Sequence, residues 1–190
     1  MVGPEDPTLT LVGSRPVNKL LRYVGAGSAY LAPLLLLVSD ILLIQFISEP
    51  GLLVQRIALI AFIPAIVAVA VLAHDRARWQ ISGGGALAIL GALAIVIRQG
   101  FLAAPTRPPA VLFPLGLLVL SGAMIGTTVS RRVAALIGAG ALLFPLAHMS
   151  GVPAALIGGD LIFLAAFWSL ATQMTRTAPP VLTKAGASGG

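Results

Sequence analysis

The sequence contains no cysteine and few charged residues, and both shortages narrow the class of protein. Without cysteine, the chain has no disulfide, no thiolate metal ligand and no cysteine nucleophile. Charged residues make up 9% of the 190 positions, whereas a soluble domain carries about 25%. With 58% hydrophobic residues and a mean hydropathy of +1.01, a water-soluble fold would expose large apolar patches. We therefore expect a protein whose solvent is lipid.

The sequence also lacks complete motifs for catalysis and for nucleotide binding. The serine and three glycines at 82–85 are not followed by the Gly-Lys-Ser/Thr of a phosphate-binding loop, and no Gly-x-Ser-x-Gly occurs. We therefore expect no enzymatic activity. A net charge of +6 would suggest nucleic acid as the partner of a soluble chain. Here the basic residues stand singly or in pairs at the ends of apolar runs, so we expect no nucleic-acid partner.

Long apolar runs fill most of the chain, and each is close to the roughly 20 residues that cross the hydrocarbon core as a helix. The first run follows more than twenty polar-rich residues and is too long for the hydrophobic part of a signal peptide, so we expect no cleaved secretory signal. The sequence predicts an all-α integral membrane bundle of about six transmembrane helices within residues 23–174, of which the fifth is the shortest. The six predicted spans are 23–47, 52–74, 82–103, 109–129, 132–148 and 152–174.

The two ends of the chain are polar and are predicted to lie outside the bundle. Residues 1–22 form an N-terminal tail, in which Ser14 to Tyr23 are expected to make a short interfacial helix capped by Ser14. Arg15, Lys19 and Arg22 would share one face of that helix and attract anionic lipid. Residues 175–190, which end in a run of glycine, alanine and serine, are expected to form a flexible C-terminal tail.

The lysines and arginines beside the spans are unevenly distributed between the two sides of the predicted bundle. Because cytoplasmic loops are enriched in these residues, the distribution predicts that both termini are cytoplasmic. The tight loops and the Arg78–Trp79 turn are typical of small bacterial membrane proteins, so we expect the bacterial cytoplasmic membrane. The inner side would carry nine basic residues: Arg15, Lys19, Arg22, Arg76, Arg78, Arg131, Arg132, Arg176 and Lys184. The outer side would carry three: Arg56, Arg98 and Arg107.

Four charged residues fall inside the outer parts of the predicted spans. Asp40 and Asp160 lie about 11 Å below the outer boundary, at 1.5 Å per helical residue, and Arg56 and Arg98 lie in the same outer layer. Charges within a bilayer are costly and mark functional sites or buried pairs. Because the four charges balance, we favour a structural aspartate–arginine pairing over a transport role for the carboxylates.

His74 and His148 are the two histidines, and haem ligation is one hypothesis for them. His74 ends the second span on the inner side, whereas His148 ends the fifth on the outer side. They would be separated by about the 30 Å thickness of the hydrocarbon core, so they cannot ligate one haem together. Each is interpreted as an interfacial histidine, with a single axial bond to a haem or pigment as the alternative. No metal site and no cofactor are predicted.

Small residues recur at four-residue spacing within the spans. This spacing lets helix backbones approach closely, which favours helix association in lipid. We expect most of these residues to pack the bundle against itself. The residues are Gly84, Ala88, Gly122, Gly126, Ala134, Gly138, Ala154 and Gly158.

These patterns favour a non-catalytic accessory subunit that packs against other integral membrane proteins and stabilises a larger complex. The alternative is a small ion-coupled transporter that uses Asp40 and Asp160. That alternative requires a water-accessible cavity at the carboxylates and helix breaks at Pro33 and 158–159. A haem- or pigment-binding membrane subunit is a further alternative.

Overall fold

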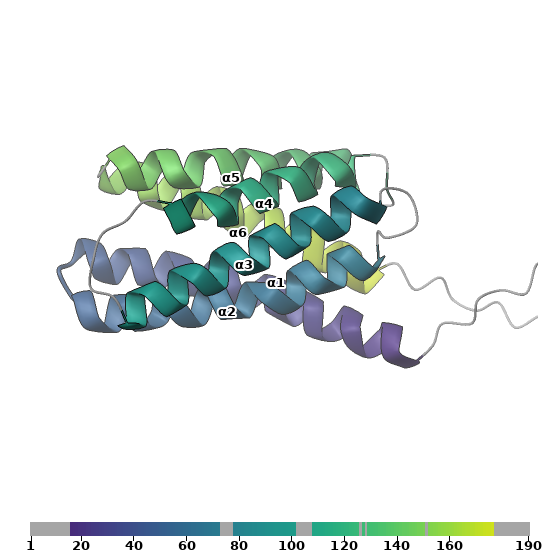
Figure 1. Ribbon diagram of the computed structural model, residues 1–190, viewed down its shortest axis with the longest axis horizontal. Coiled ribbons are helices and arrows are strands. Elements are labelled where there is room, and N and C mark those ends of the chain that lie inside the picture. The colour runs from purple at the N-terminus through teal and green to yellow at the C-terminus, as the bar shows by residue number, and fades with distance from the viewer. Residues whose placement is uncertain are drawn as a thin grey trace, which may run out of the picture.

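The computed structural model of the chain describes residues 16–72, 78–101, 108–125, 127, 129–150 and 152–176, and within these ranges it contains helices and no strand. The all-helical class predicted from the sequence is confirmed (Figure 1). All of these helices except α4 are long and apolar enough to cross a membrane. The helices are α1 (Pro16–Ile44), α2 (Ser48–Leu72), α3 (Arg78–Phe101), α4 (Pro108–Met124), α5 (Arg131–Ser150) and α6 (Pro153–Arg176).

The shortest of these helices is α4, with 17 residues, and not α5, which has 20. The apolar run of the fourth span continues to residue 129, but α4 ends at Met124. There the amide and the hydroxyl of Thr127 both donate to the Met124 carbonyl, which turns the chain out of the helix. Ser130 then caps α5 by accepting a hydrogen bond from the amide of Val133. Local turn and cap bonds, rather than hydropathy, therefore set this boundary.

The first helix begins earlier than the predicted span. It runs for 29 residues without interruption from Pro16, a residue favoured at the first position of a helix. The residues expected to form a separate interfacial helix are thus the first turns of α1, as far as they are described. Lys19 is exposed there and Arg22 is half-buried, whereas Ser14 and Arg15 lie outside the described residues.

The six helices form a closed ring. Each helix packs against its neighbours in the chain, and α6 packs against α1 to complete the circle. The first residue of α1 and the last residue of α6 therefore lie at the same end of the bundle (Figure 1). Apolar side chains fill the interior, and many large ones, such as Leu20, Leu53 and Leu90, are exposed on the outside. An apolar exterior around an apolar core is the arrangement expected of helices in lipid.

The backbones of α3 and α4 approach each other closely, and glycines make this approach feasible. A Cβ added to Gly84 would lie 2.8 Å from the backbone nitrogen of Leu120. A Cβ on Gly116 would lie 2.2 Å from the backbone nitrogen of Ala88, which is fully buried. The predicted small residues Gly84 and Ala88 thus lie where the two backbones meet. Gly91, at which a Cβ would lie 2.2 Å from the nitrogen of Phe113, extends the same contact.

The other small residues divide between the inside and the outside of the ring. The Ser121 hydroxyl donates to the carbonyl of buried Ala134, and a Cβ on Gly138 would lie 2.7 Å from the same hydroxyl oxygen. By contrast, Gly122 and Gly158 have open space where a Cβ would stand, and Ala154 is exposed. These three do not pack the bundle against itself, because no other described helix lies against them. Gly126 lies outside the described residues.

Candidate functional site

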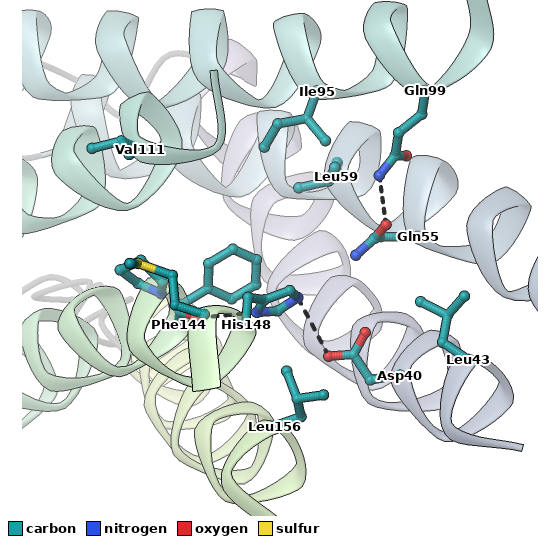
Figure 2. Close-up of a pocket in the computed structure, with 12 residues that line it drawn as sticks. Asp40, Leu43, Gln55, Leu59, Ile95, Gln99, Val111, Phe144, His148 and Leu156 are labelled. Carbon is teal, nitrogen blue, oxygen red and sulfur yellow. Dashed lines mark hydrogen bonds and ion pairs between the residues drawn. The ribbon is translucent and has the colours of Figure 1, made fainter. Parts of the chain in front are cut away.

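A cavity of about 530 Å³ lies at the end of the bundle where α1 ends and α2 begins. Every helix contributes to its wall, which combines a few polar groups with a mostly apolar surface (Figure 2). Its volume falls within the range of small-molecule sites, about 300–1,000 Å³. The lining residues are Asp40, Leu43, Gln55, Leu59, Ile95, Gln99, Val111, Phe144, Pro145, His148, Met149 and Leu156.

Asp40 is the acidic residue of this lining. It lies one turn before the end of α1, and its side chain is 2% exposed. One carboxyl oxygen, Oδ2, lies 3.8 Å from Nε2 of His148, in the last turn of α5 (Figure 2). The two side chains meet because α1 and α5 both end at this side of the ring. A buried carboxylate thus faces the cavity beside a histidine ring.

Asp160 stands next to Asp40, although it does not line the cavity. It lies in the third turn of α6, is 1% exposed, and is close enough to Asp40 for the two carboxyl groups to interact. Within the described chain, the Oδ2 atom of each aspartate has no hydrogen-bond partner. The contact follows from the closure of the ring, in which α6 packs against α1. Two carboxylates at this range repel each other unless a proton or a cation lies nearby.

Arg56 and Arg98 lie toward the cavity end of the bundle but outside the cavity wall. Arg56 donates a hydrogen bond to the main-chain carbonyl of Gln99, and the Gln99 side chain donates to Oε1 of Gln55 at 2.6 Å. For Arg56 the structure therefore shows a backbone partner where the sequence suggested an aspartate. Arg98 lies in the last turn of α3 and is half-buried, and neither arginine lines the cavity. An aspartate pair with Arg98 stays a prediction.

The His148 ring is fixed by two contacts within its own helix. Its Nδ1 lies 2.9 Å from the main-chain carbonyl of Phe144, and the two rings are 4.3 Å apart. The side chain is 35% exposed. Sequence reasoning treated His148 as an interfacial residue and missed its contact with Asp40. The signal was present, because both residues lie near the outer ends of spans that run in the same direction. His74 lies outside the described residues.

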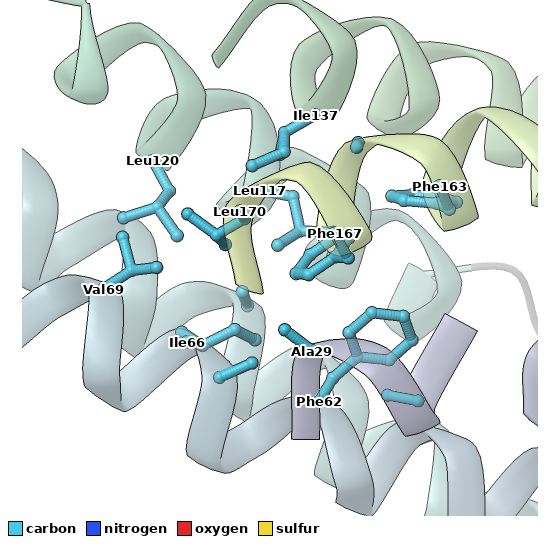
Figure 3. Packing of buried hydrophobic residues seen from close by; sticks show 14 of the residues in the cluster. Ala29, Phe62, Ile66, Val69, Leu117, Leu120, Ile137, Phe163, Phe167 and Leu170 are labelled. Atoms are coloured by element: carbon cyan, nitrogen blue, oxygen red, sulfur yellow. The ribbon is translucent and has the colours of Figure 1, made fainter. Parts of the chain in front are cut away.

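Below the cavity, a cluster of phenylalanines fills the centre of the ring. Phe144 belongs both to the cavity lining and to this cluster, since its ring lies 6.0 Å from Phe113 and 5.8 Å from Phe163. Phe62 joins the cluster from α2, with its ring 4.9 Å from that of Phe167 (Figure 3). Edge-on aromatic contacts of this kind stabilise a packed core. Sequence reasoning missed the cluster, because a mid-span phenylalanine can equally face lipid.

Comparison with known proteins adds no family to this description. No protein-family model matches the chain, and neither a curated protein nor a solved structure matches it. The fold and the composition nevertheless define the class. The chain is a multi-pass helical membrane protein with a cavity among its helices.

Proposed function

We propose that this protein is a small, non-enzymatic solute carrier whose binding site is the cavity at Asp40. The observation that carries the proposal is a carboxylate, 2% exposed, in the wall of a cavity to which all six helices contribute. Charged groups within a membrane bundle mark substrate and ion pathways when they face a cavity. This proposal departs from a purely structural role for Asp40, because the residue lines the cavity and Arg56 donates to a backbone carbonyl.

The two helices that bear the aspartates constrain how such a carrier moves. Pro33 lies inside α1, and Gly158 and Gly159 lie inside α6, yet both helices are continuous through these residues. The proposed carrier therefore opens by tilting whole helices against each other rather than through unwound half-helices. The polar contacts that would have to break are few, since the interior of the ring is mainly apolar.

We also propose that the cavity opens to the outer side and that both termini are cytoplasmic. The basic residues support this orientation, because cytoplasmic segments are enriched in lysine and arginine. Arg56 and Arg98 lie toward the cavity end, near the start of α2 and the end of α3. The opposite end of the bundle carries the other described lysine and arginines: Lys19, Arg22, Arg78, Arg131, Arg132 and Arg176.

Cysteine labelling tests the carrier proposal without knowledge of the substrate. The chain has no cysteine, so Ile95→Cys in the cavity wall and Ile66→Cys in the core form a clean matched pair. A membrane-impermeant thiol reagent would be applied to vesicles of both orientations. A carrier that alternates between two open states exposes Ile95→Cys to both faces, whereas Ile66→Cys stays unlabelled. Labelling of Ile95→Cys from a single face would contradict a carrier.

A second candidate is the accessory subunit of a larger membrane complex. The observation that favours it is the set of glycines on the outside of the ring, Gly27, Gly83, Gly122 and Gly158, which have open space around them. Such positions would let a helix of another protein approach closely. Cross-linking in native membranes tests this candidate. A partner recovered with the unaltered chain should be lost with Gly122→Leu and kept with Leu115→Ile.

A further inference from the structure

The hydrogen-bonding state of the His148 ring bears on what the cavity can bind beside Asp40. A carbonyl oxygen only accepts, so Nδ1 of His148 is the nitrogen that donates its hydrogen to Phe144. In the neutral ring, Nε2 then carries a lone pair, because the partner of one nitrogen sets the tautomer of the other. That lone pair points toward Oδ2 of Asp40 at 3.8 Å. A proton on Nε2, or a hydrogen-bond donor or cation bound between the two atoms, stabilises this arrangement.

Asp160 places a second carboxyl group beside Asp40. Its carboxyl group interacts with that of Asp40, and Oδ2 of each aspartate lacks a hydrogen-bond partner within the described chain. Asp40 and Asp160 are 2% and 1% exposed, so bulk water screens them poorly. The basic residues of this layer, Arg56 and Arg98, do not line the cavity. The cavity lining at Asp40 therefore combines a carboxyl and an imidazole group, and among the described residues it includes no lysine or arginine.

The rest of the wall indicates the type of cation. Eight of the twelve lining residues are apolar, including Leu59, Ile95 and Phe144. A bare metal ion needs several close oxygen ligands and far less than 530 Å³. Among the described residues, no group of three His, Asp or Glu side chains is arranged to hold a metal ion. An organic molecule with an apolar body matches both the volume and the apolar wall.

We propose that the cavity binds an amphipathic organic cation with an N–H-bearing ammonium group. The ammonium would lie at Asp40 and donate hydrogens to its Oδ2 and to Nε2 of His148. The apolar body would lie against Leu59, Ile95 and Phe144. This inference names the substrate class of the carrier proposed above and rests on that proposal for the role of the cavity.

Three probes of matched shape and different charge test the substrate class: 2-phenylethylammonium, 2-phenylethanol and 3-phenylpropanoate. Each would be added to the purified Ile95→Cys protein in mild detergent, and its protection against thiol alkylation would be measured by titration. We expect the ammonium to protect at a concentration at least about tenfold lower than the alcohol, and the carboxylate not to protect. Equal protection by all three probes would overturn the inference.

Variants at Asp40 identify the group that recognises the charge. Adding Asp40→Asn to Ile95→Cys should weaken protection by the ammonium about tenfold or more and leave protection by the alcohol unchanged. Asp40→Glu keeps the charge and should keep the preference. If Asp40→Asn does not fold, the charge preference of the parent protein still decides the question.

The outcomes separate this inference from the carrier proposal. Labelling from both membrane faces without a charge preference would support the carrier proposal and contradict the proposal that the substrate is an organic cation. A charge preference with labelling from one face would support a cation-binding site and contradict the carrier proposal.

Discussion

The hydroxyl of Ser39 on α1 donates a 2.9 Å hydrogen bond to the main-chain carbonyl of Gly51 on α2. Ser39 is fully buried and precedes Asp40, so this bond ties the acidic turn of α1 to the neighbouring helix. We expect Ser39→Ala to lower the free energy of unfolding by about 0.5–1.5 kcal/mol. The variant loses the hydrogen bond between α1 and α2 and has an apolar methyl group in place of the hydroxyl. Denaturant titration in mild detergent measures this change.

The control for Ser39 is Ser169→Ala. The Ser169 hydroxyl donates to the carbonyl of Ala165 within its own helix. Because no second helix is held by this bond, we expect stability to change little. Equal losses in the two variants would contradict the interhelical role of Ser39.

The contact between α3 and α4 predicts a large effect at Gly91. A Cβ there would lie 2.2 Å from the backbone nitrogen of Phe113, and a backbone atom cannot move aside as a flexible side chain can. We expect Gly91→Ala to destabilise the protein by at least about 2 kcal/mol, since the two helices must separate. Gly122→Ala, at a position with open space, should raise stability by up to about 1 kcal/mol. Thermal unfolding of both variants measures the contrast.

Phe46, in the turn between α1 and α2, has a φ of 62°. The amide of Ile47 donates to the carbonyl of Leu42 and that of Phe46 to Leu43, which is the pattern of a left-handed helix cap. Glycine adopts this backbone conformation without the steric cost that a side chain brings. We therefore expect Phe46→Gly to raise stability by up to about 1 kcal/mol in detergent, where no bilayer anchors the exposed ring. Ile47→Gly, one residue later, should lower stability.

The orientation of the chain can be tested at the two ends of the bundle. Reporter domains fused after Ile47, between α1 and α2, and after Arg176, at the end of α6, should report opposite sides of the membrane. The arrangement of basic residues predicts that Arg176 is cytoplasmic. Detection of both reporters on one side would contradict the six-span topology.

Most of the fold could be predicted from hydropathy, whereas the ends of helices could not. Long apolar runs located all six described helices, although α1 begins seven residues before its predicted span, because lipid requires about 20 apolar residues for each span. The end of α4 was missed, since the bonds from Thr127 to Met124 stop the helix inside an apolar run. Hydropathy indicates whether a residue prefers lipid or water, but it does not indicate which group hydrogen-bonds to a backbone carbonyl.

The sequence predicted how deep the site residues lie in the bundle, but it did not predict which of these residues contact each other. Asp40, Asp160 and Arg56 were placed in one layer, but position along a helix does not tell which way a side chain faces. Arg56 turns to the carbonyl of Gln99, and the packing of α6 against α1 brings Asp160 to Asp40 instead. Small residues occur on every predicted span and would permit close contacts between many pairs of helices. The sequence therefore does not reveal the order of the helices around the ring.

The last prediction concerns the partner of Asp40. Its Oδ2 lies 3.8 Å from Nε2 of His148, whereas Arg56 bonds to a backbone carbonyl. Residues in contact show non-additive changes in stability, and residues without shared partners usually add. We therefore expect Asp40→Asn and His148→Gln to show a coupling energy of at least about 0.5 kcal/mol in a double-mutant cycle. The measurement is the free energy of unfolding of both single variants and of the double variant in one detergent.

A second cycle, between Asp40→Asn and Arg56→Gln, decides between His148 and Arg56 as the partner of Asp40. The Arg56 guanidinium is engaged with Gln99 on α3, so its loss should lower stability by the same amount whether residue 40 is aspartate or asparagine. Additivity here together with coupling at His148 places Asp40 in a carboxylate–histidine cluster that faces the cavity. Coupling to Arg56 with additivity at His148 would return Asp40 to a structural ion pair. In that case, the weaker protection by the ammonium expected for Asp40→Asn would follow from weakened folding rather than from a lost ligand.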